Sequence, residues 1–320
     1  MSKPSRVALV LGATRGIGGE TALAFARRGW RIRAFSRTTS PSFNSPGWEW
    51  VKGDALDRPS VLAASAGVHA IVHAVNPPGY RNWAKLVLPM IDNTIAAAKS
   101  GGARILLPGT IYNYGPDAFS VLREESPQNA TTHKGRIRIE LEKRLKDASR
   151  QGVRSLIVRF GDFFGPKPGN NWFSQGMVRP NSPVRSITYP GKEGVGHSWA
   201  YLPDAGEALA QLMDREAQLE NFAGFHFRGF WDKDGTEMIA SIRRVTGNPS
   251  LPVKGLPWFI FKFASPFNET LRELYATRAL WAAPIELDNR RLVRFLGKEP
   301  QTDLDRAVET TLRALGCLAN

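Results

Sequence analysis

Short apolar runs alternate with helical segments through the first half of the chain, and this alternation constrains the fold more than any other feature. The run Arg6–Ala13 is continuously apolar, as expected of a strand buried on both faces, and Gly16–Arg28 follows it with helical spacing. Further strands are expected at Arg31–Ser36, Glu49–Asp54, Ala70–Val75, Arg104–Leu107 and Arg154–Phe160, and further helices at Arg58–Ala66, Trp83–Ser100 and His133–Arg150. The pattern predicts an α/β fold with a doubly wound parallel sheet.

The alternation weakens after Gly161, where glycine, proline and aromatic residues become frequent. We therefore expect a Rossmann-type domain over residues 1–165 and a smaller C-terminal substrate-binding region over residues 166–320. The second region is expected to be interleaved with late returns of the chain to the sheet. A length of 320 residues suits one large α/β domain with such an appendage.

A glycine-rich turn lies between the first strand and the first helix. In this turn Gly12 permits a tight bend, Gly16 lets the backbone approach a phosphate, and Gly18 lets the helix pack closely on the strand. The free N–H groups and the positive dipole end of the helix favour a bound diphosphate. The turn thus predicts a dinucleotide site that involves Gly12, Thr14, Arg15, Gly16, Ile17 and Gly18.

The end of the second strand bears on which dinucleotide binds. An acidic residue there would bind the ribose 2′-hydroxyl of NAD, but the sequence reads Ser36-Arg37, with no carboxylate. Arg37 and Arg15 could together bind a 2′-phosphate, which favours NADP(H) over NAD. The alternative is that both are ordinary surface arginines.

Charge and composition narrow the possible partners. The 43 Lys and Arg residues exceed the 29 Asp and Glu residues, giving a net charge of +14 that suits phosphorylated partners or simply a basic surface. The basic residues are spread along the chain and interleaved with acidic ones, so a nucleic-acid partner ranks low. No apolar run reaches the roughly 20 residues that span a bilayer, Cys317 stands alone, and no metal-ligand spacing is present. A cytoplasmic protein without membrane insertion or metal is expected.

Several motifs, in their order along the chain, resemble the extended short-chain dehydrogenase/reductase superfamily, the NAD(P)-dependent epimerase/dehydratase-like branch in particular. Besides the glycine turn these are Gly53-Asp54-Ala55-Leu56-Asp57, His73-Ala74-Val75-Asn76, Gly109-Thr110-Ile111-Tyr112-Asn113-Tyr114-Gly115, Val158-Arg159-Phe160-Gly161-Asp162-Phe163-Phe164-Gly165-Pro166, His197–Asp204 and Asp288–Pro300. The resemblance implies that Asp54, Ala55 and Ala74 line the cofactor. It also implies that Thr110 is the Ser/Thr that orients the substrate oxygen.

The chain departs from this family at its central catalytic motif. The family uses Tyr-x-x-x-Lys, in which the tyrosine exchanges a proton with the substrate hydroxyl and the lysine binds the ribose and lowers the tyrosine pKa. If Glu140 is matched to the glutamate that the family has on this helix, Thr132 takes the tyrosine position and Arg136 takes the lysine position. Threonine is no acid near neutral pH, although Arg136 could still hold a ribose or a phosphate.

The acid or base is therefore left open among several groups. His133 and Tyr112 are the leading candidates, His133 because an imidazole has the most suitable intrinsic pKa. Tyr114 and Lys134 are further candidates, and packing or solvent exposure is the alternative for each.

The expected function is NADP(H)-dependent hydride transfer to or from a carbinol or carbonyl of a small molecule such as a sugar nucleotide. It would be either net oxidoreduction or an epimerase/dehydratase cycle. A non-catalytic NADP(H)-binding sensor or assembly protein is the alternative, and the family resemblance suggests a homodimer.

Aromatic-rich segments such as Trp172-Phe173 and Trp258–Phe267 would form core or line an apolar cleft. The stretch Pro257–Tyr275 could also form a lid or a docking surface.

Overall fold

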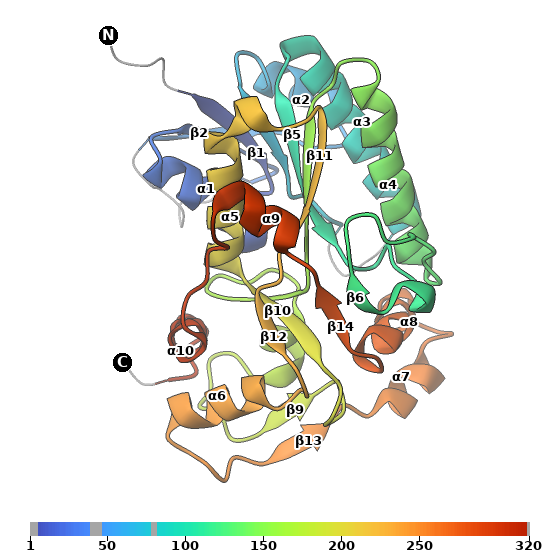
Figure 1. Ribbon diagram of the computed structural model, residues 1–320, viewed down its shortest axis with the longest axis vertical. Helices are drawn as coiled ribbons and strands as arrows, with labels where there is room; N and C mark the ends of the chain where they lie inside the picture. Colours follow the sequence, from blue (N-terminus) through green and yellow to red (C-terminus); the bar gives the residue numbers. More distant parts are fainter. Residues whose placement is uncertain (1–5, 39–46, 78–81, 319–320) are drawn as a thin grey trace.

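The computed structural model describes residues 6–38, 47–77 and 82–318. Its centre is a seven-stranded sheet in the order β11-β7-β5-β4-β1-β2-β3, in which every neighbouring pair is parallel (Figure 1). The strands are β1 Val7–Leu11, β2 Arg31–Ser36, β3 Trp48–Lys52, β4 Ala70–His73, β5 Arg104–Thr110, β7 Ser155–Phe160 and β11 Phe222–His226. The predicted Rossmann-type fold class is confirmed.

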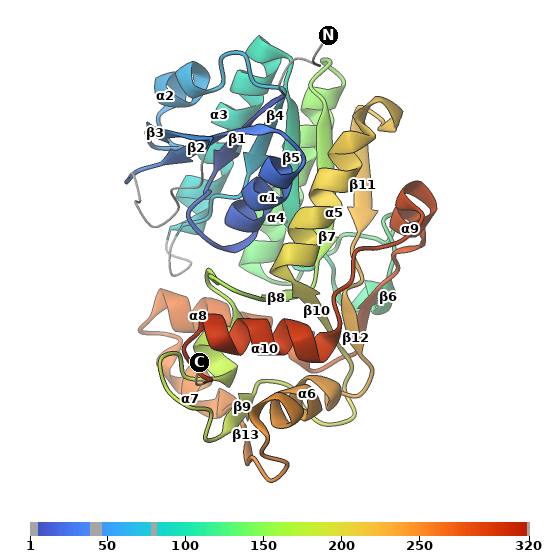
Figure 2. The same ribbon diagram turned by 90° about the vertical axis from the view of Figure 1, so that its left-hand side faces the viewer.

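Helices cover both faces of this sheet, as Figure 2 shows. One face packs against α1 (Gly16–Arg27) and α5 (Leu202–Asp214), and the other against α2 (Arg58–Ala64), α3 (Trp83–Gly101) and α4 (His133–Ser149). Alternate residues of β1 point to the two cores, with Val10 in the first and Leu9 in the second, and both are fully buried. Burial on both faces explains why the strands are continuously apolar in the sequence.

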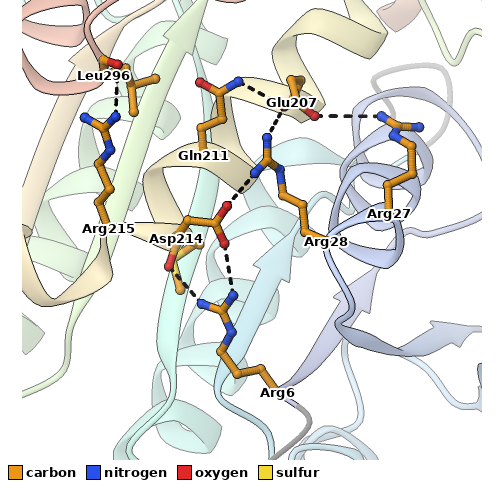
Figure 3. Close-up of polar contacts among 9 residues, drawn as sticks. Arg6, Arg27, Arg28, Glu207, Gln211, Asp214, Arg215 and Leu296 are labelled. Carbon is orange, nitrogen blue, oxygen red and sulfur yellow. Dashed lines mark hydrogen bonds and ion pairs between the residues drawn. The ribbon is translucent and has the colours of Figure 1, made fainter. Parts of the chain in front are cut away.

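Ion pairs join the C-terminal end of α1 to α5 (Figure 3). The Arg28 guanidinium contacts the carboxylates of Glu207 and Asp214. Arg6 pairs with Asp214 at 3.0 Å, and the Gln211 amide donates to Glu207 at 2.9 Å. Burial raises the pKa of the Glu207 carboxyl, but the hydrogen bonds from Gln211 and Arg28 outweigh it and hold that pKa below its ordinary value of 4.5. The cluster fixes the two helices relative to each other.

Replacing Glu207 with glutamine is expected to lower the free energy of unfolding by about 1 kcal/mol at pH 7. Because the folded state holds the pKa of Glu207 below 4.5, its contribution is complete above that pH and is lost as the pH falls through the folded value. The variant should therefore lose less stability than the wild type between neutral pH and pH 3.5. Urea denaturation at both pH values measures this. Glu309→Gln, in an exposed pair with Arg313, is the control and should change stability by at most about 0.5 kcal/mol.

The smaller region consists of short strands and helices below the carboxyl end of the sheet (Figure 1). The strands are β6 Ser120–Leu122, β8 Asp162–Phe164, β9 Ile187–Tyr189, β10 His197–Tyr201, β12 Phe230–Asp232, β13 Val253–Gly255 and β14 Ile285–Leu287. The helices of this region are α6 Glu237–Thr246, α7 Trp258–Ala264, α8 Glu269–Ala276 and α10 Leu304–Ala314, with a 3₁₀ segment, η6, at Thr277–Trp281. The short helix α9 (Arg290–Leu296) instead packs against β11 of the large sheet. β8, β10 and β12 form a three-stranded sheet.

The chain passes between the two regions more than once. After β8 it forms part of the smaller region, and it then returns to the large sheet as α5 and β11. The domain boundary near residue 165 stays a prediction. Among the described helices, none is both long enough and apolar enough to cross a membrane.

Candidate active site

The turn between β1 and α1 is shaped by three glycines. Gly12 has a φ of +92° and Gly16 a φ of +60°, in the left-handed region where a side chain is strained. A Cβ at Gly12 would lie 2.7 Å from the carbonyl oxygen of Ala74, and a Cβ at Gly18 would lie 2.4 Å from that of Gly12. The first turn of α1 carries no acidic residue, so nothing there opposes an anion at the helix N-terminus. These features fit the diphosphate of a dinucleotide.

The remaining residues of the turn differ in exposure. Thr14 and Ile17 are half-buried, whereas Arg15, the N-cap residue of α1, is exposed. The N–H of Gly16 donates to the carbonyl oxygen of Lys167 at 2.9 Å, in the segment after β8. A loop of the smaller region therefore lies against the turn that would bind the diphosphate.

The neighbouring strands end at the same edge of the sheet, because all of them are parallel. Asp54 and Ala55 follow β3, and the carbonyl oxygen of Ala55 accepts a hydrogen bond from the Asn93 amide at 2.9 Å. Ala74 follows β4, and its N–H donates to the carbonyl oxygen of Leu11 at 3.0 Å. The structure thus brings the expected cofactor residues to one edge, and their individual roles stay predictions.

The sequence candidates for catalysis separate into two groups. Thr110 ends β5, and its hydroxyl accepts a hydrogen bond from the N–H of Tyr112 at 3.3 Å. His133 is exposed at the start of α4, and the exposed Arg136 guanidinium donates to the carbonyl oxygen of Thr131 at 3.0 Å. The structure therefore brings Thr110 and Tyr112 together but leaves His133 and Arg136 at the surface, and all four catalytic roles stay predictions.

A different pair of α4 side chains is buried. Lys134 is 1% exposed and Arg138 is 5% exposed. The guanidinium Nη2 of Arg138 donates to the Asn76 Oδ1 at 2.8 Å, directly beyond β4. Thr132 instead forms the N-cap of α4, where its hydroxyl accepts a hydrogen bond from the N–H of Gly135 at 3.0 Å.

Aromatic rings surround the end of the Lys134 side chain. Its Nζ lies 5.4 Å from the ring centroid of Tyr112 and 5.8 Å from that of Trp83. Burial lowers the pKa of the Lys134 ammonium to about 8, and the Glu273 carboxylate opposes this shift. The lysine can therefore change its charge close to neutral pH.

Lys134 is also part of a pocket wall. The pocket lies between the loop after β5, the start of α4 and the α8–η6 segment, and it is lined by Tyr112, Tyr114, Pro116, Phe119, Thr131, Thr132, Lys134, Ala276, Thr277, Ala279 and Leu280. A separate cavity of about 200 Å³ between β10, β12 and α6 shares none of these residues and lies away from the glycine turn.

The spacing of the apolar residues in α4 contains the signal that would have identified Lys134 and Arg138. Ile137, Leu141 and Leu145 repeat every four residues and pack on the sheet. Because a helix has about 3.6 residues per turn, the same face also includes the residues three positions before Ile137 and Leu141, which are Lys134 and Arg138. The pair that we placed by matching Glu140 to a glutamate of the family, Thr132 and Arg136, lies instead at the helix cap and on the outer face of the helix.

A buried polar network fixes the other end of this helix face. The guanidinium Nε of Arg159 in β7 donates to the Glu142 Oε1 at 3.1 Å, and both side chains are only 6% exposed. His226 in β11 donates from Nδ1 to the Leu122 carbonyl oxygen (3.1 Å), so its Nε2 accepts the Tyr114 hydroxyl at 2.8 Å. Burial lowers the pKa of His226 to about 3 and raises that of Tyr114, so both stay neutral. The Tyr114 hydroxyl is thus committed to His226.

The aromatic segments divide between core and surface. Trp199 is fully buried, and Trp281 stacks on the His197 ring with centroids 3.7 Å apart. On and after α7, Phe263 is 74% and Phe267 91% exposed. The interpretation as core therefore holds for Trp199 and Phe173, whereas the apolar cleft, the lid and the docking surface stay predictions.

Residues 8–223 match the NAD dependent epimerase/dehydratase family. The chain belongs to this family. The sequence-based expectation of an enzyme of this kind is thereby confirmed.

Solved structures of similar fold extend over nearly the whole chain. MoeE5 in complex with UDP-glucose and NAD is 15% identical at a TM-score of 0.76, covering 97% of this chain and 98% of that one. UDP-glucose 4-epimerase from Brucella ovis in complex with NAD is 16% identical at 0.76, covering 98% and 99%. UDP-N-acetylglucosamine 4-epimerase from Bacillus cereus is 15% identical at 0.73, covering 96% and 97%. No curated protein matches the chain. At these identities the neighbours show the fold of this family member.

The prediction that NADP is the cofactor is wrong. The MoeE5 and Brucella ovis structures hold NAD, and the matched family is NAD dependent. In this chain Arg37 lies beyond the last residue of β2, and both Arg37 and Arg15 are exposed. On a basic protein, exposed arginines in loops are ordinary surface residues, so they do not indicate a 2′-phosphate.

Proposed function

We propose that this family member is an NAD-dependent enzyme that transfers hydride at a carbinol or carbonyl carbon of a sugar nucleotide, in an epimerase or dehydratase reaction. One observation supports the proposal most. Lys134 and Arg138 lie on the buried face of α4: Lys134 lines the pocket that contains Tyr112, and Arg138 donates a hydrogen bond to Asn76, two residues after the Ala74 that borders Gly12.

The residues at the sheet edge fit NAD. The diphosphate can bind at the glycine turn, where Gly12 and Gly18 leave no room for a Cβ and the backbone stays close. The N-terminus of α1, whose first turn has no acidic residue, favours the negative charge. Asp54 follows β3, where it can bind the adenosine half. NAD supplies the hydride acceptor of the reaction when it is bound.

On the substrate side, Thr110 lies at the end of β5 beside Tyr112 and can orient a substrate oxygen. The net charge of +14 attracts a substrate that itself carries a diphosphate. The neighbours named for UDP-sugars support this substrate class. The homodimer and the cytoplasmic location stay predictions, and no observation favours the non-catalytic alternative.

Titration with NADH is expected to quench tryptophan fluorescence and to saturate, because the centroid of the Trp83 ring lies 5.8 Å from the Nζ of Lys134 in the pocket wall. NADPH should bind at least about tenfold more weakly, since no described contact favours a 2′-phosphate. Incubation of the NAD⁺-loaded protein with UDP-glucose, UDP-galactose and their N-acetylated forms should then give an epimer or a dehydrated product, detected by chromatography. If neither nucleotide binds, the proposed function is wrong.

A further inference from the structure

Lys134 and Arg138 keep the four-residue spacing of the catalytic pair that the family uses. Residues four apart on a helix share a face, and these two share the face that carries Ile137 and Leu141 into the core. Glu142, eight residues after Lys134, is buried on the same side and paired with Arg159. Thr132 and Arg136, spaced in the same way, lie at the helix cap and at the surface.

Arg138 reaches the edge where NAD would bind. Its guanidinium donates to the Asn76 Oδ1 at 2.8 Å, two residues beyond Ala74, and the carbonyl oxygen of Ala74 borders the Gly12 position. The guanidinium lies 5.1 Å from the Trp83 ring centroid, which holds it on this side of the helix. A guanidinium stays charged and offers several N–H donors, so it suits the hydroxyls of a ribose and is unsuited to proton transfer.

Lys134 faces the pocket one helical turn earlier. The charged groups around its Nζ come from three elements: Glu273 on α8, Asp162 at the start of β8, and Arg138 on α4 itself. The two carboxylates favour the ammonium, whereas burial and Arg138 favour the neutral amine. A primary amine held between these influences can both accept and donate a proton, which Thr132 and Arg136 cannot do.

We propose that Lys134 is the acid and base of the reaction and that Arg138 holds the cofactor ribose, so that Lys-x-x-x-Arg replaces the Tyr-x-x-x-Lys of the family. This inference rests on the proposed function. In the oxidative direction the neutral Nζ accepts the proton of the substrate hydroxyl, while the substrate carbon gives up a hydride with both electrons to NAD⁺. The products are a ketone, NADH and the Lys134 ammonium. In the reductive direction the ammonium returns the proton to the substrate oxygen.

The proposal gives the direction of the pH dependence. Oxidation needs the neutral amine, so its rate should rise as the pH increases through about 8. Reduction needs the ammonium, so its rate should fall over the same interval.

The first test uses the titration of the Lys134 side chain by NMR, with its signal assigned from the Lys134→Met variant. NAD⁺ carries one more positive charge on the nicotinamide than NADH. If Lys134 faces that ring, saturating NAD⁺ should give a lower titration midpoint than saturating NADH. Lys143, exposed on the same helix, is the control and should give equal midpoints. Equal midpoints for Lys134 in both complexes would overturn the proposal, whatever the substrate is.

The second test separates proton transfer from binding. Lys134→Met and Lys134→Arg should bind NADH as the wild type does and lose roughly 10²–10⁴-fold in kcat with the sugar nucleotide that the wild type turns over. Arg138→Met should weaken NADH binding at least about tenfold, and Arg138→Lys should restore part of it.

The outcomes distinguish this inference from the proposed function. A wild type that binds no NADH contradicts both. A wild type that binds and turns over, together with a Lys134→Met variant that keeps its kcat, contradicts this inference alone. So does a loss of NADH binding in Arg136→Met with none in Arg138→Met, because the pair would then lie two residues earlier. If no tested sugar nucleotide reacts, the midpoint comparison decides.

Discussion

Gly18→Ala is expected to weaken NADH binding about 100-fold, equivalent to about 2.7 kcal/mol, and to destabilise the fold. The added Cβ would lie 2.4 Å from the carbonyl oxygen of Gly12 and 2.9 Å from the Cβ of Ala74. Neither neighbour can move easily, because one is backbone and the other belongs to a residue directly after β4. The start of α1 must therefore shift away from β1, which misplaces the N–H groups that bind the diphosphate.

The expected loss of folding free energy from this overpacking is about 1–3 kcal/mol. Fluorescence titration with NADH and urea denaturation measure the two effects separately. Gly224→Ala in β11 is the matched control, because a Cβ there would meet no atom within 4 Å. A Gly18→Ala variant that binds NADH as tightly as the control would show that the turn does not hold the dinucleotide.

Glu142→Gln is expected to destabilise the protein by about 3 kcal/mol or more, the largest stability effect that we predict. Arg159 is buried and paired with this carboxylate through two of its nitrogens, so the variant leaves a charge in the interior without its counterion. The same guanidinium lies beside Tyr114, whose hydroxyl binds His226, so the damage should extend to β11.

Urea denaturation at neutral pH measures this effect, and Glu140→Gln is the control. Glu140 is half-exposed and pairs with Arg144 one turn along the same helix, so its loss should be about 0.3–0.5 kcal/mol. The double variant Glu142→Met/Arg159→Met should be more stable than Glu142→Gln, because it buries no unpaired charge. Equal effects of Glu140→Gln and Glu142→Gln would contradict the assignment of Glu142 as the buried anchor.

The large sheet could be predicted from the sequence because its strands are buried on both faces. The expected strand Arg31–Ser36 has the same bounds in the structure, and the helix expected at His133–Arg150 is observed at His133–Ser149. The smaller region could not be resolved in this way. Its strands are mostly three residues long and pair with distant segments, as β6 does with β14, so no local period marks them.

The candidate site could be predicted only where backbone geometry defines it. Gly12, Gly16 and Gly18 are required by positive φ angles and close contacts, and such requirements are visible as glycines. On α4 basic residues occupy most turns, and residue type alone does not show which of them faces inward. The inward face is defined by Ile137 and Leu141, which pack in the core. The alignment based on Glu140 alone did not take this packing into account. The prediction of NADP from Arg37 was wrong because an exposed arginine can be an ordinary surface residue, and its presence alone does not indicate a bound 2′-phosphate.

The order of strands has a consequence for synthesis on the ribosome. The outermost strand beside β7 is β11, and α5, which covers α1 and one face of the sheet, also comes late in the chain. The nucleotide-binding half therefore cannot be completed before residue 226 has left the exit tunnel, although its first strand begins at residue 7. Until then β7 presents an unpaired edge and α1 an uncovered apolar side, both of which favour aggregation.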